Sequence, residues 1–323
     1  MPGGRREARR PALLRFVAAA ANARGAARAY RPHTVATLLS VPNVSEGREP
    51  SALDAIEAAF ATNARVLDRH EDHDHHRAVF SLLGHPGTLS QALLAGAREA
   101  LARVDLRDPR GQHPHVGVID VVPLVHVSDA QRGAACAEAL VTAELLGGEL
   151  HLPVFLYGAL AGGRTRAQIR RGGIENLAAR IADGELTPDF GPRRMHRSAG
   201  AVLVGARPPL VAFNLELAPP AHLGSAREIA AAIREGGPEG LPGLRAIGIE
   251  LHTRERTAQV SMNVEDPQAL PLAAIVEAVS RHADVAAAEI VGLAPAAALE
   301  GFPRGLEIRD FDRARQIIEN HLD

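Results

Sequence analysis

The sequence predicts an α+β fold of two ferredoxin-like α/β subdomains, each a mixed sheet flanked by helices. The second half of the chain reads as strand, helix, strand, strand, helix, strand, which is the ferredoxin-like order. The first half opens with the same order and then adds a helix and a strand. A Pro- and Gly-rich stretch at 184–208 is expected to be a linker. We therefore expect an N-terminal subdomain at 34–205 and a C-terminal subdomain at 206–323.

The first half is organised around one apolar segment, Val116 to Val127. Such a Val-rich run is typical of a strand that is buried on both faces. Its one charge, Asp120, should have a partner, because an unpaired buried carboxylate is costly. The other expected strands are 34–42, 64–67, 78–83 and 154–158. The expected helices are one capped by Ser51 with apolar positions from Leu53 to Phe60, one at 89–104, and one that begins at a cap formed by Ser128 or Asp129.

The second half contains the four strands and two helices of the ferredoxin-like order. We expect the strands at 210–217, 244–252, 259–264 and 285–291, and the helices at 226–235 and 272–281. A last helix is expected at 311–322.

Residues 1–33 differ from the rest of the chain. They are rich in arginine and alanine, and Glu7 is their only acidic residue. The apolar part is short and interrupted by Arg15, so it is not a membrane span. We expect a poorly ordered basic extension. No later segment is long and apolar enough to cross a membrane, which predicts a soluble, cytoplasmic protein without a membrane partner.

Composition excludes several classes of function. The 323 residues carry a formal net charge of −2, which argues against a nucleic-acid partner. Cys136 is the only cysteine, so the chain has neither an intrachain disulfide nor a cysteine metal cluster.

The decapeptide 68–77 (DRHEDHDHHR) is very polar and rich in side chains that can bind metals. One hypothesis is a metal site, because zinc uses histidine and carboxylate ligands. No cysteine contributes, however, and the spacing matches no standard zinc motif. The other hypothesis is a solvated polar loop that lines a cleft for an anionic substrate, and we therefore expect no metal.

His113 and His115 flank Pro114 where the central strand begins. A histidine at the end of a strand is a candidate proton-transfer group, because its pKa lies near neutrality. A histidine that only caps the strand would give the same pattern.

Several segments resemble the formiminotransferase domain family, as in glutamate formimidoyltransferase. Their order along the chain covers roughly residues 41 to 299, which a single short motif cannot do. The similar segments are 41–48 (VPNVSEGR, for VPNFSEG), 74–79 (DHHRAV, for DHNRSV), 113–120 (HPHVGVID, for HPRxGxxD), 155–158 (FLYG, for YLYG), 188–192 (PDFGP), 212–214 (AFN) and 258–263 (AQVSMN).

The resemblance implies two subdomains with a ligand cleft between them, in a homodimer, without a cyclodeaminase domain. It implies transfer of the formimino group from N-formimino-L-glutamate to N5 of tetrahydrofolate, a co-substrate, in histidine degradation and one-carbon metabolism. His113 matches the family's proposed general base. The motif positions further imply that substrate or folate is bound by His75, His76, Arg77, His115, Asp120, Asn43, Tyr157 and Gly158.

The proposed chemistry agrees with these residue types. An amine attacks an amidine carbon, so one group must accept a proton and later return one, which a histidine can do. Both substrates carry carboxylates, which favours arginine in the cleft. Arg77 is the best-positioned arginine, although an ion pair with Asp72 or Asp74 would also explain it.

Five positions depart from the family pattern: His76, Ala78, His115, Ala159 and Glu216. His115 replaces an arginine, and Glu216 stands where a second asparagine is usual. The alternatives are a divergent member that binds folate or another small anion with different or no activity, and a His-rich metal-binding protein.

Overall fold

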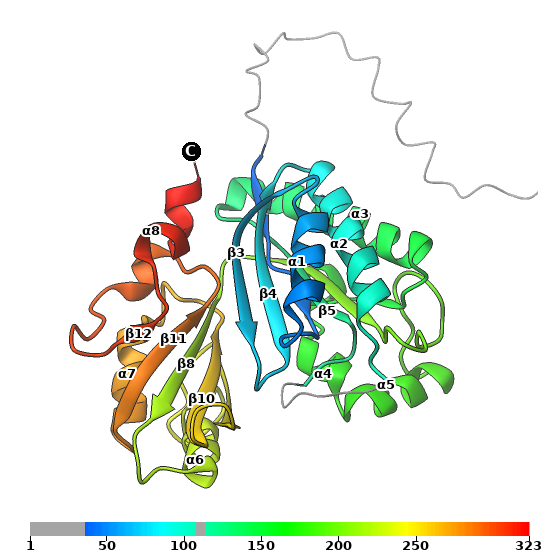
Figure 1. The fold of residues 1–323 in the computed structure, drawn as a ribbon. Helices are drawn as coiled ribbons and strands as arrows, with labels where there is room; N and C mark the ends of the chain where they lie inside the picture. Colours follow the sequence, from blue (N-terminus) through cyan, green and yellow to red (C-terminus); the bar gives the residue numbers. More distant parts are fainter. Residues whose placement is uncertain (1–35, 108–113, 323) are drawn as a thin grey trace, which may run out of the picture. The chain divides into compact units, whose positions relative to one another are not determined.

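The computed structural model describes residues 36–107 and 114–322 and contains two sheets. Both are flanked by helices, which confirms the predicted α+β class with two subdomains (Figure 1). The predicted N-terminal extension, 1–33, and the predicted base, His113, lie outside the described residues. Within the described part of the chain, no helix is long and apolar enough to cross a membrane.

The first sheet has the order β3-β4-(β1/β2)-β5-β7-β6. β1 and β2 are two pieces of one strand, since both pair antiparallel with β4 and β5. Up to β5 the order is ferredoxin-like, and β7 and β6 extend the sheet in parallel. The strands are β1 Leu38–Ser40, β2 Asn43–Val44, β3 Arg65–Asp72, β4 Arg77–Gly84, β5 Ile119–Val125, β6 Val154–Leu156 and β7 Val202–Arg207.

The main core of the first subdomain lies between this sheet and three helices, α1 Pro50–Phe60, α2 Thr88–Arg103 and α3 Arg132–Glu149. Phe60 and Phe80 meet in it, with ring centroids 5.2 Å apart. Two short helices, α4 Arg166–Arg170 and α5 Gly173–Ala182, contribute to a smaller core. This core also contains Phe155 of β6 and the adjacent Tyr157. As predicted, Ser128 caps the turn that leads into α3, and it forms a capping box with Gln131.

The second sheet has the order β12-β11-β8-β10-β9. Its four long strands follow the ferredoxin-like order, which confirms the predicted topology. Helices α6 Leu223–Ile233 and α7 Leu272–Ser280 supply apolar residues to its core. The strands are β8 Val211–Leu217, β9 Leu244–Leu251, β10 Thr257–Val264, β11 Val285–Val291 and β12 Ile308–Arg309.

The predicted linker at 184–208 contains a buried strand, so that expectation was wrong. β7 lies between β5 and β6 and carries an apolar run with one glycine, Gly205. A methyl group added at Gly205 would lie 2.7 Å from the ring of Tyr157, so this glycine permits packing and does not mark a turn. The change from the first sheet to the second falls at 208–210, beyond the predicted boundary.

The predicted polar loop at 68–77 is a β-hairpin. β3 continues to Asp72 and pairs with β4 down to Arg77, leaving only a turn between them. Asp68, Asp74 and His75 are buried, so the segment is not a solvated loop. The sequence concealed this hairpin because its side chains are polar on both faces.

The predicted last helix at 311–322 is also wrong. It is α8 Arg313–Gln316 followed by a 3₁₀ turn at Ile318–His321. Ile317 between them is extended, and the N–H of Ile318 donates to the carbonyl of Ala294 at 3.0 Å, which ends the helix.

Candidate active site

The face of the second sheet opposite α6 and α7 carries polar side chains. Alternate residues of β10 from Ala258 to Val264 are buried in the core with these helices. Because side chains alternate along a strand, Ser261 and Asn263 project from the other face. The register places Ser261 opposite Asn214 of β8. The AFN and AQVSMN segments thus meet on one surface.

That surface forms one wall of a cavity of about 630 Å³, and the first subdomain supplies the other. The volume lies in the range of small-molecule sites. The charged and hydrogen-bonding side chains that line the cavity are Asn43, His75, Arg77, Thr165, Arg166, Arg170, Asn214, Arg234, Glu235, Arg245, Ser261, Asn263 and Glu265.

Arg77 and Asn43 are joined in the cavity wall. β2 pairs with β4, which brings Asn43 beside the first residues of β4. Nε and Nη2 of Arg77 donate to Oδ1 of Asn43 at 2.9 and 2.6 Å, and Nδ2 of Asn43 donates to the carbonyl of Val41 at 2.7 Å. Arg77 therefore lines the cavity, and its described ion pair is with Asp120 and not with Asp72 or Asp74.

Asp120 lies behind this wall and is fully buried. Its Oδ1 accepts the N–H of Val116 at 2.9 Å, and its Oδ2 pairs with Nη1 of Arg77 at 3.1 Å and with Nη2 of Arg170. Burial raises the pKa of Asp120, but the two guanidinium groups, the N–H of Val116 and His115 together outweigh it, and the net pKa is below the usual value. Asp120 thus has the partners that its burial requires, and it anchors two arginines of the cavity.

Burial also lowers the pKa of Arg77 to about 10, with Asp120 opposing this shift and Arg170 adding to it. The guanidinium remains charged at neutral pH.

Sequence reasoning missed the arginines of α4. Thr165 caps this helix, and Arg166 and Arg170 at its two ends both line the cavity. These arginines are hard to recognise from the sequence, because arginines on a short segment after a Gly-rich loop usually face solvent.

The cavity has an excess of positive charge. Among the described residues that line it, five are arginines and two are glutamates. Both glutamates pair with the same arginine, since Arg245 lies 3.0 Å from Glu235 and 3.4 Å from Glu265. Such a site favours anionic ligands.

His75 and His76 belong to the turn at 73–76 of the β3–β4 hairpin. His75 is 8% exposed and lines the cavity, and its N–H donates to Oδ1 of Asp72 at 2.7 Å. Burial lowers the pKa of His75, which favours the neutral ring. His76 adopts a left-handed backbone with φ of 50° and turns toward Glu46, with Nδ1 3.5 Å from the carboxylate.

Pro114, the first described residue of the HPH segment, lines the cavity. His115 is partly buried and lies close enough to Asp120 to help lower its pKa.

Tyr157 and Gly158 are absent from the described lining of the cavity. Tyr157 is a core residue, 5% exposed, with the guanidinium of Arg166 5.7 Å from its ring centroid. It therefore lies behind a cleft arginine. Gly158 has φ of 67°, a conformation that suits glycine and that opens the 3₁₀ turn after β6.

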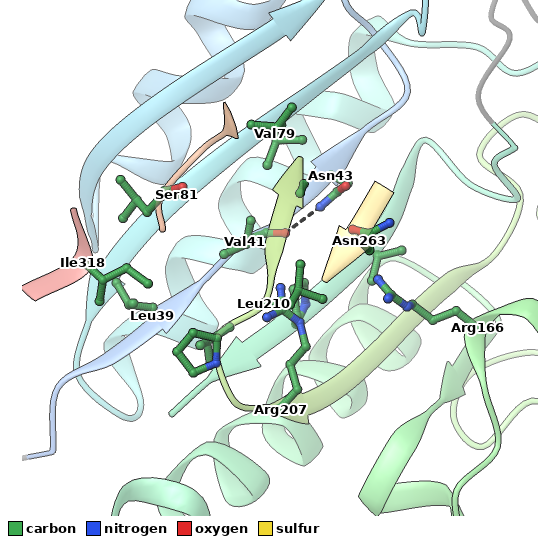
Figure 2. A pocket seen from close by; sticks show the side chains of 17 residues that line it. Leu39, Val41, Asn43, Val79, Ser81, Arg166, Arg207, Leu210, Asn263 and Ile318 are labelled. Atoms are coloured by element: carbon green, nitrogen blue, oxygen red, sulfur yellow. Dashed lines mark hydrogen bonds between the residues drawn. The ribbon is translucent and has the colours of Figure 1, made fainter. Parts of the chain in front are cut away.

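A narrower chamber of about 70 Å³ shares Asn43, Arg166 and Asn263 with the main cavity. Figure 2 shows these side chains with Arg207 and aliphatic residues from several strands. Burial lowers the pKa of Arg207 to about 10, so it too remains a cation at neutral pH. The chamber adds a mainly apolar recess to a polar cleft.

The structure accounts for the charge at Glu216, which departs from the family pattern. Glu216 is 3% exposed and accepts two hydrogen bonds at 3.0 and 2.8 Å from Nε and Nη2 of Arg309, and another from Arg254. Two arginines thus compensate the buried carboxylate. Of the other departures, Ala78 is buried in the core and Ala159 is exposed.

The hairpin turn also contacts the second subdomain. Asp74 accepts the N–H groups of His252 and Thr253 at 2.9 and 3.2 Å and the Thr253 hydroxyl at 2.5 Å. Its carboxylate is therefore occupied by protein donors. Among the described residues, no group of three or more His, Cys, Asp or Glu side chains is arranged to hold a metal ion.

Comparison with known proteins agrees with this geometry. The N-terminal subdomain of the formiminotransferase domain matches residues 37–207, and the formiminotransferase domain matches residues 212–301. The glutamate formimidoyltransferase of Streptococcus pyogenes is 34% identical over 87% of this chain and 97% of its own length. The chain belongs to the formiminotransferase family.

Other members of the formiminotransferase family are similarly related. The glutamate formimidoyltransferase of Thermoplasma acidophilum is 31% identical over 88% of this chain and 96% of its own length. The formimidoyltransferase-cyclodeaminase of Rattus norvegicus is 34% identical, and the match spans half of that protein. The chain is accordingly a transferase of the formiminotransferase type. The two matched domains divide at 208–211, where the sheets also change.

Proposed function

We propose that this member of the formiminotransferase family transfers the formimino group from N-formimino-L-glutamate to N5 of tetrahydrofolate. The observation that carries the proposal is the convergence of family motifs from both subdomains on one cavity. Asn43 and Arg77 line it from the first sheet, and Asn214 and Asn263 from the second.

The charge of the cavity supports these substrates. N-formimino-L-glutamate and tetrahydrofolate both carry carboxylates, and the cavity wall contains more arginines than acids. Its volume of about 630 Å³ and its apolar recess suit a ligand with both polar and ring-shaped parts.

The reaction needs one group that moves protons. N5 of tetrahydrofolate attacks the formimino carbon and loses a proton, and the glutamate nitrogen gains a proton as it leaves. We assign this general acid–base role to His113, at roughly 10²–10⁴-fold in rate. Pro114, the next residue, lines the cavity, which supports the assignment. In this proposal His75, His76, His115, Tyr157 and Gly158 complete or support the binding site.

Replacing the two histidines of the HPH segment tests that assignment. His113→Ala should leave tetrahydrofolate affinity nearly unchanged and lower turnover by about 10²-fold or more. His115→Ala and the double variant show whether the second imidazole substitutes for the first. If His115→Ala alone abolishes turnover while His113→Ala retains it, the assignment is wrong.

We further propose that the chain acts in the cytoplasm as a homodimer, in histidine degradation and one-carbon metabolism. Light scattering on the purified chain tests the dimer, and a monomer mass at working concentration would contradict it.

The experiment that tests the activity is consumption of N-formimino-L-glutamate by the purified chain, with and without tetrahydrofolate. We expect consumption only when tetrahydrofolate is present. A divergent member without this activity would show calorimetric binding of tetrahydrofolate but no consumption, and that result would reject the proposed reaction.

A further inference from the structure

Arg170 presents a buried hydrogen-bond donor at the cavity. Its side chain is 16% exposed, and its ion pair within the described chain is with Asp120, through Nη2. Its Nε is buried and has no acceptor among residues 36–107 and 114–322. A buried donor on a charged group is costly to leave unsatisfied, and Arg170 lines the cavity, which favours an acceptor supplied by a ligand.

Arg170 also shares its counter-ion. Oδ2 of Asp120 contacts both Arg170 and Arg77, so one negative charge is divided between two guanidinium groups. Asp120 is fully buried and its other oxygen is bound to Val116, so it acts as a fixed support behind Arg170. An anion that enters from the cavity would supply the negative charge that Arg170 shares with Arg77 in its absence.

The chemistry of the two substrates indicates which anion this is. Pro114 and Val116 follow His113, the proposed base, in the sequence. Asp120, which holds Arg170, accepts the N–H of Val116, and Pro114 lines the cavity. Arg170 is therefore connected to the segment that follows the base. In N-formimino-L-glutamate, one carbon bears both the reacting nitrogen and the α-carboxylate. In tetrahydrofolate, the p-aminobenzoyl group separates N5 from the glutamate carboxylates. A carboxylate bound beside the reacting atoms therefore belongs to the donor.

We propose that Arg170 binds the α-carboxylate of the formimino-group donor and that Asp120 holds the guanidinium in place. This subsite rests on the proposed function, and Arg170 is the residue in it that selects an α-amino acid donor. It predicts weak use of donors that lack the α-carboxylate.

The test compares two donors with two variants of the full chain. N-formimino-4-aminobutyrate keeps the distal carboxylate of N-formimino-L-glutamate and lacks the α-carboxylate. The wild-type chain should favour N-formimino-L-glutamate in kcat/KM by roughly 10- to 100-fold, the value of a charged hydrogen bond. In Arg170→Gln this preference should disappear through a higher KM for N-formimino-L-glutamate, while the KM for tetrahydrofolate is unchanged.

Two further variants separate this role from a structural one. Arg170→Lys keeps the charge but not the planar fork, and it should restore part of the preference. Arg171→Gln is the matched control, because Arg171 is exposed and pairs with Glu185; it should behave like the wild type. A thermal unfolding scan of each variant confirms that it is folded.

Calorimetric binding of both donors, without tetrahydrofolate, distinguishes failure of the subsite from failure of the reaction. A chain that prefers N-formimino-L-glutamate through Arg170 but forms no product supports the subsite and contradicts the reaction. An active chain whose Arg170→Gln variant keeps the full preference, or loses tetrahydrofolate affinity instead, overturns the subsite. A wild-type chain that binds both donors equally also overturns it.

Discussion

Oδ2 of Asp120 lies 3.1 Å from Nη1 of Arg77, and the aspartate side chain has no exposed surface. The pair joins the middle strand of the first sheet to the cavity wall. A buried carboxylate with such partners is stable only while the partners remain, because removing one member of a buried pair leaves an uncompensated charge.

Asp120→Asn should therefore lower the free energy of unfolding by about 3–5 kcal/mol, because Arg77 and Arg170 lose their shared carboxylate. Urea unfolding measures this as a lower midpoint with an unchanged slope. Asp105→Asn is the control, since Asp105 pairs with Arg107 at the surface and its loss should leave the midpoint unchanged. Equal midpoints for the two variants would refute a structural role for the buried pair.

The second prediction concerns the contact between Asp74 and Thr253. Thr253→Val removes a 2.5 Å hydroxyl bond and should cost about 1 kcal/mol of stability, whereas Thr253→Ser keeps the bond and should cost less. Asp74→Ala should also speed amide exchange at His252 and Thr253, whose N–H groups lose their acceptor. Unchanged exchange at both amides would show that the contact does not hold this turn.

Much of the fold could be predicted, because the spacing of apolar residues along the chain indicates which residues are buried. The Val-rich central strand and the ferredoxin-like order of both halves follow from apolar spacing alone. The β3–β4 hairpin could not be predicted in this way, because its buried groups, among them Asp68 and Asp74, are charged and their partners are distant in sequence. β7 was concealed by a glycine that serves ring packing and by the prolines around it.

The site was predictable only where a motif marks it. Arg77 and Asn43 were found through the resemblance, and both line the cavity. Arg170 was not, because its importance depends on its pairing with Asp120, 50 residues away in sequence. Tyr157 is in a matching motif but contributes packing beside Arg166.

A third prediction concerns the start of α2, which has no side-chain cap of its own and begins after Gly87 with φ of 88°. The buried carboxylate of Glu138 in α3 accepts the N–H groups of Gly87 and Ser90 at 2.8 and 2.7 Å. Glu138→Gln should cost about 1–3 kcal/mol, because an amide nitrogen replaces one of the two oxygens that accept the N–H of Gly87, and the remaining bonds lose the charge of the carboxylate. Urea unfolding tests this, with exposed Glu144→Gln in the same helix as control. Identical midpoints would contradict the prediction.

The fourth prediction is a pH dependence that originates at His75. Burial lowers the pKa of His75 below its ordinary 6.5, so the unfolded chain binds a proton at a higher pH than the folded chain does. Stability contributed by the neutral ring is therefore present above about pH 6.5 and is lost as the pH falls below it. The melting temperature of His75→Asn should fall less than that of the wild type between about pH 7 and pH 5. Parallel curves for the two proteins would exclude His75 as a source of the pH dependence.

Following the transferred carbon itself tests the proposed reaction without relying on any variant. N-formimino-L-glutamate labelled with ¹³C in the formimino group is mixed with tetrahydrofolate and the purified chain, and the label is followed by NMR. We expect the labelled carbon to move to N5 of the folate while unlabelled glutamate is released. A label that stays on glutamate, or that appears as free formamide or formate without folate product, would contradict it.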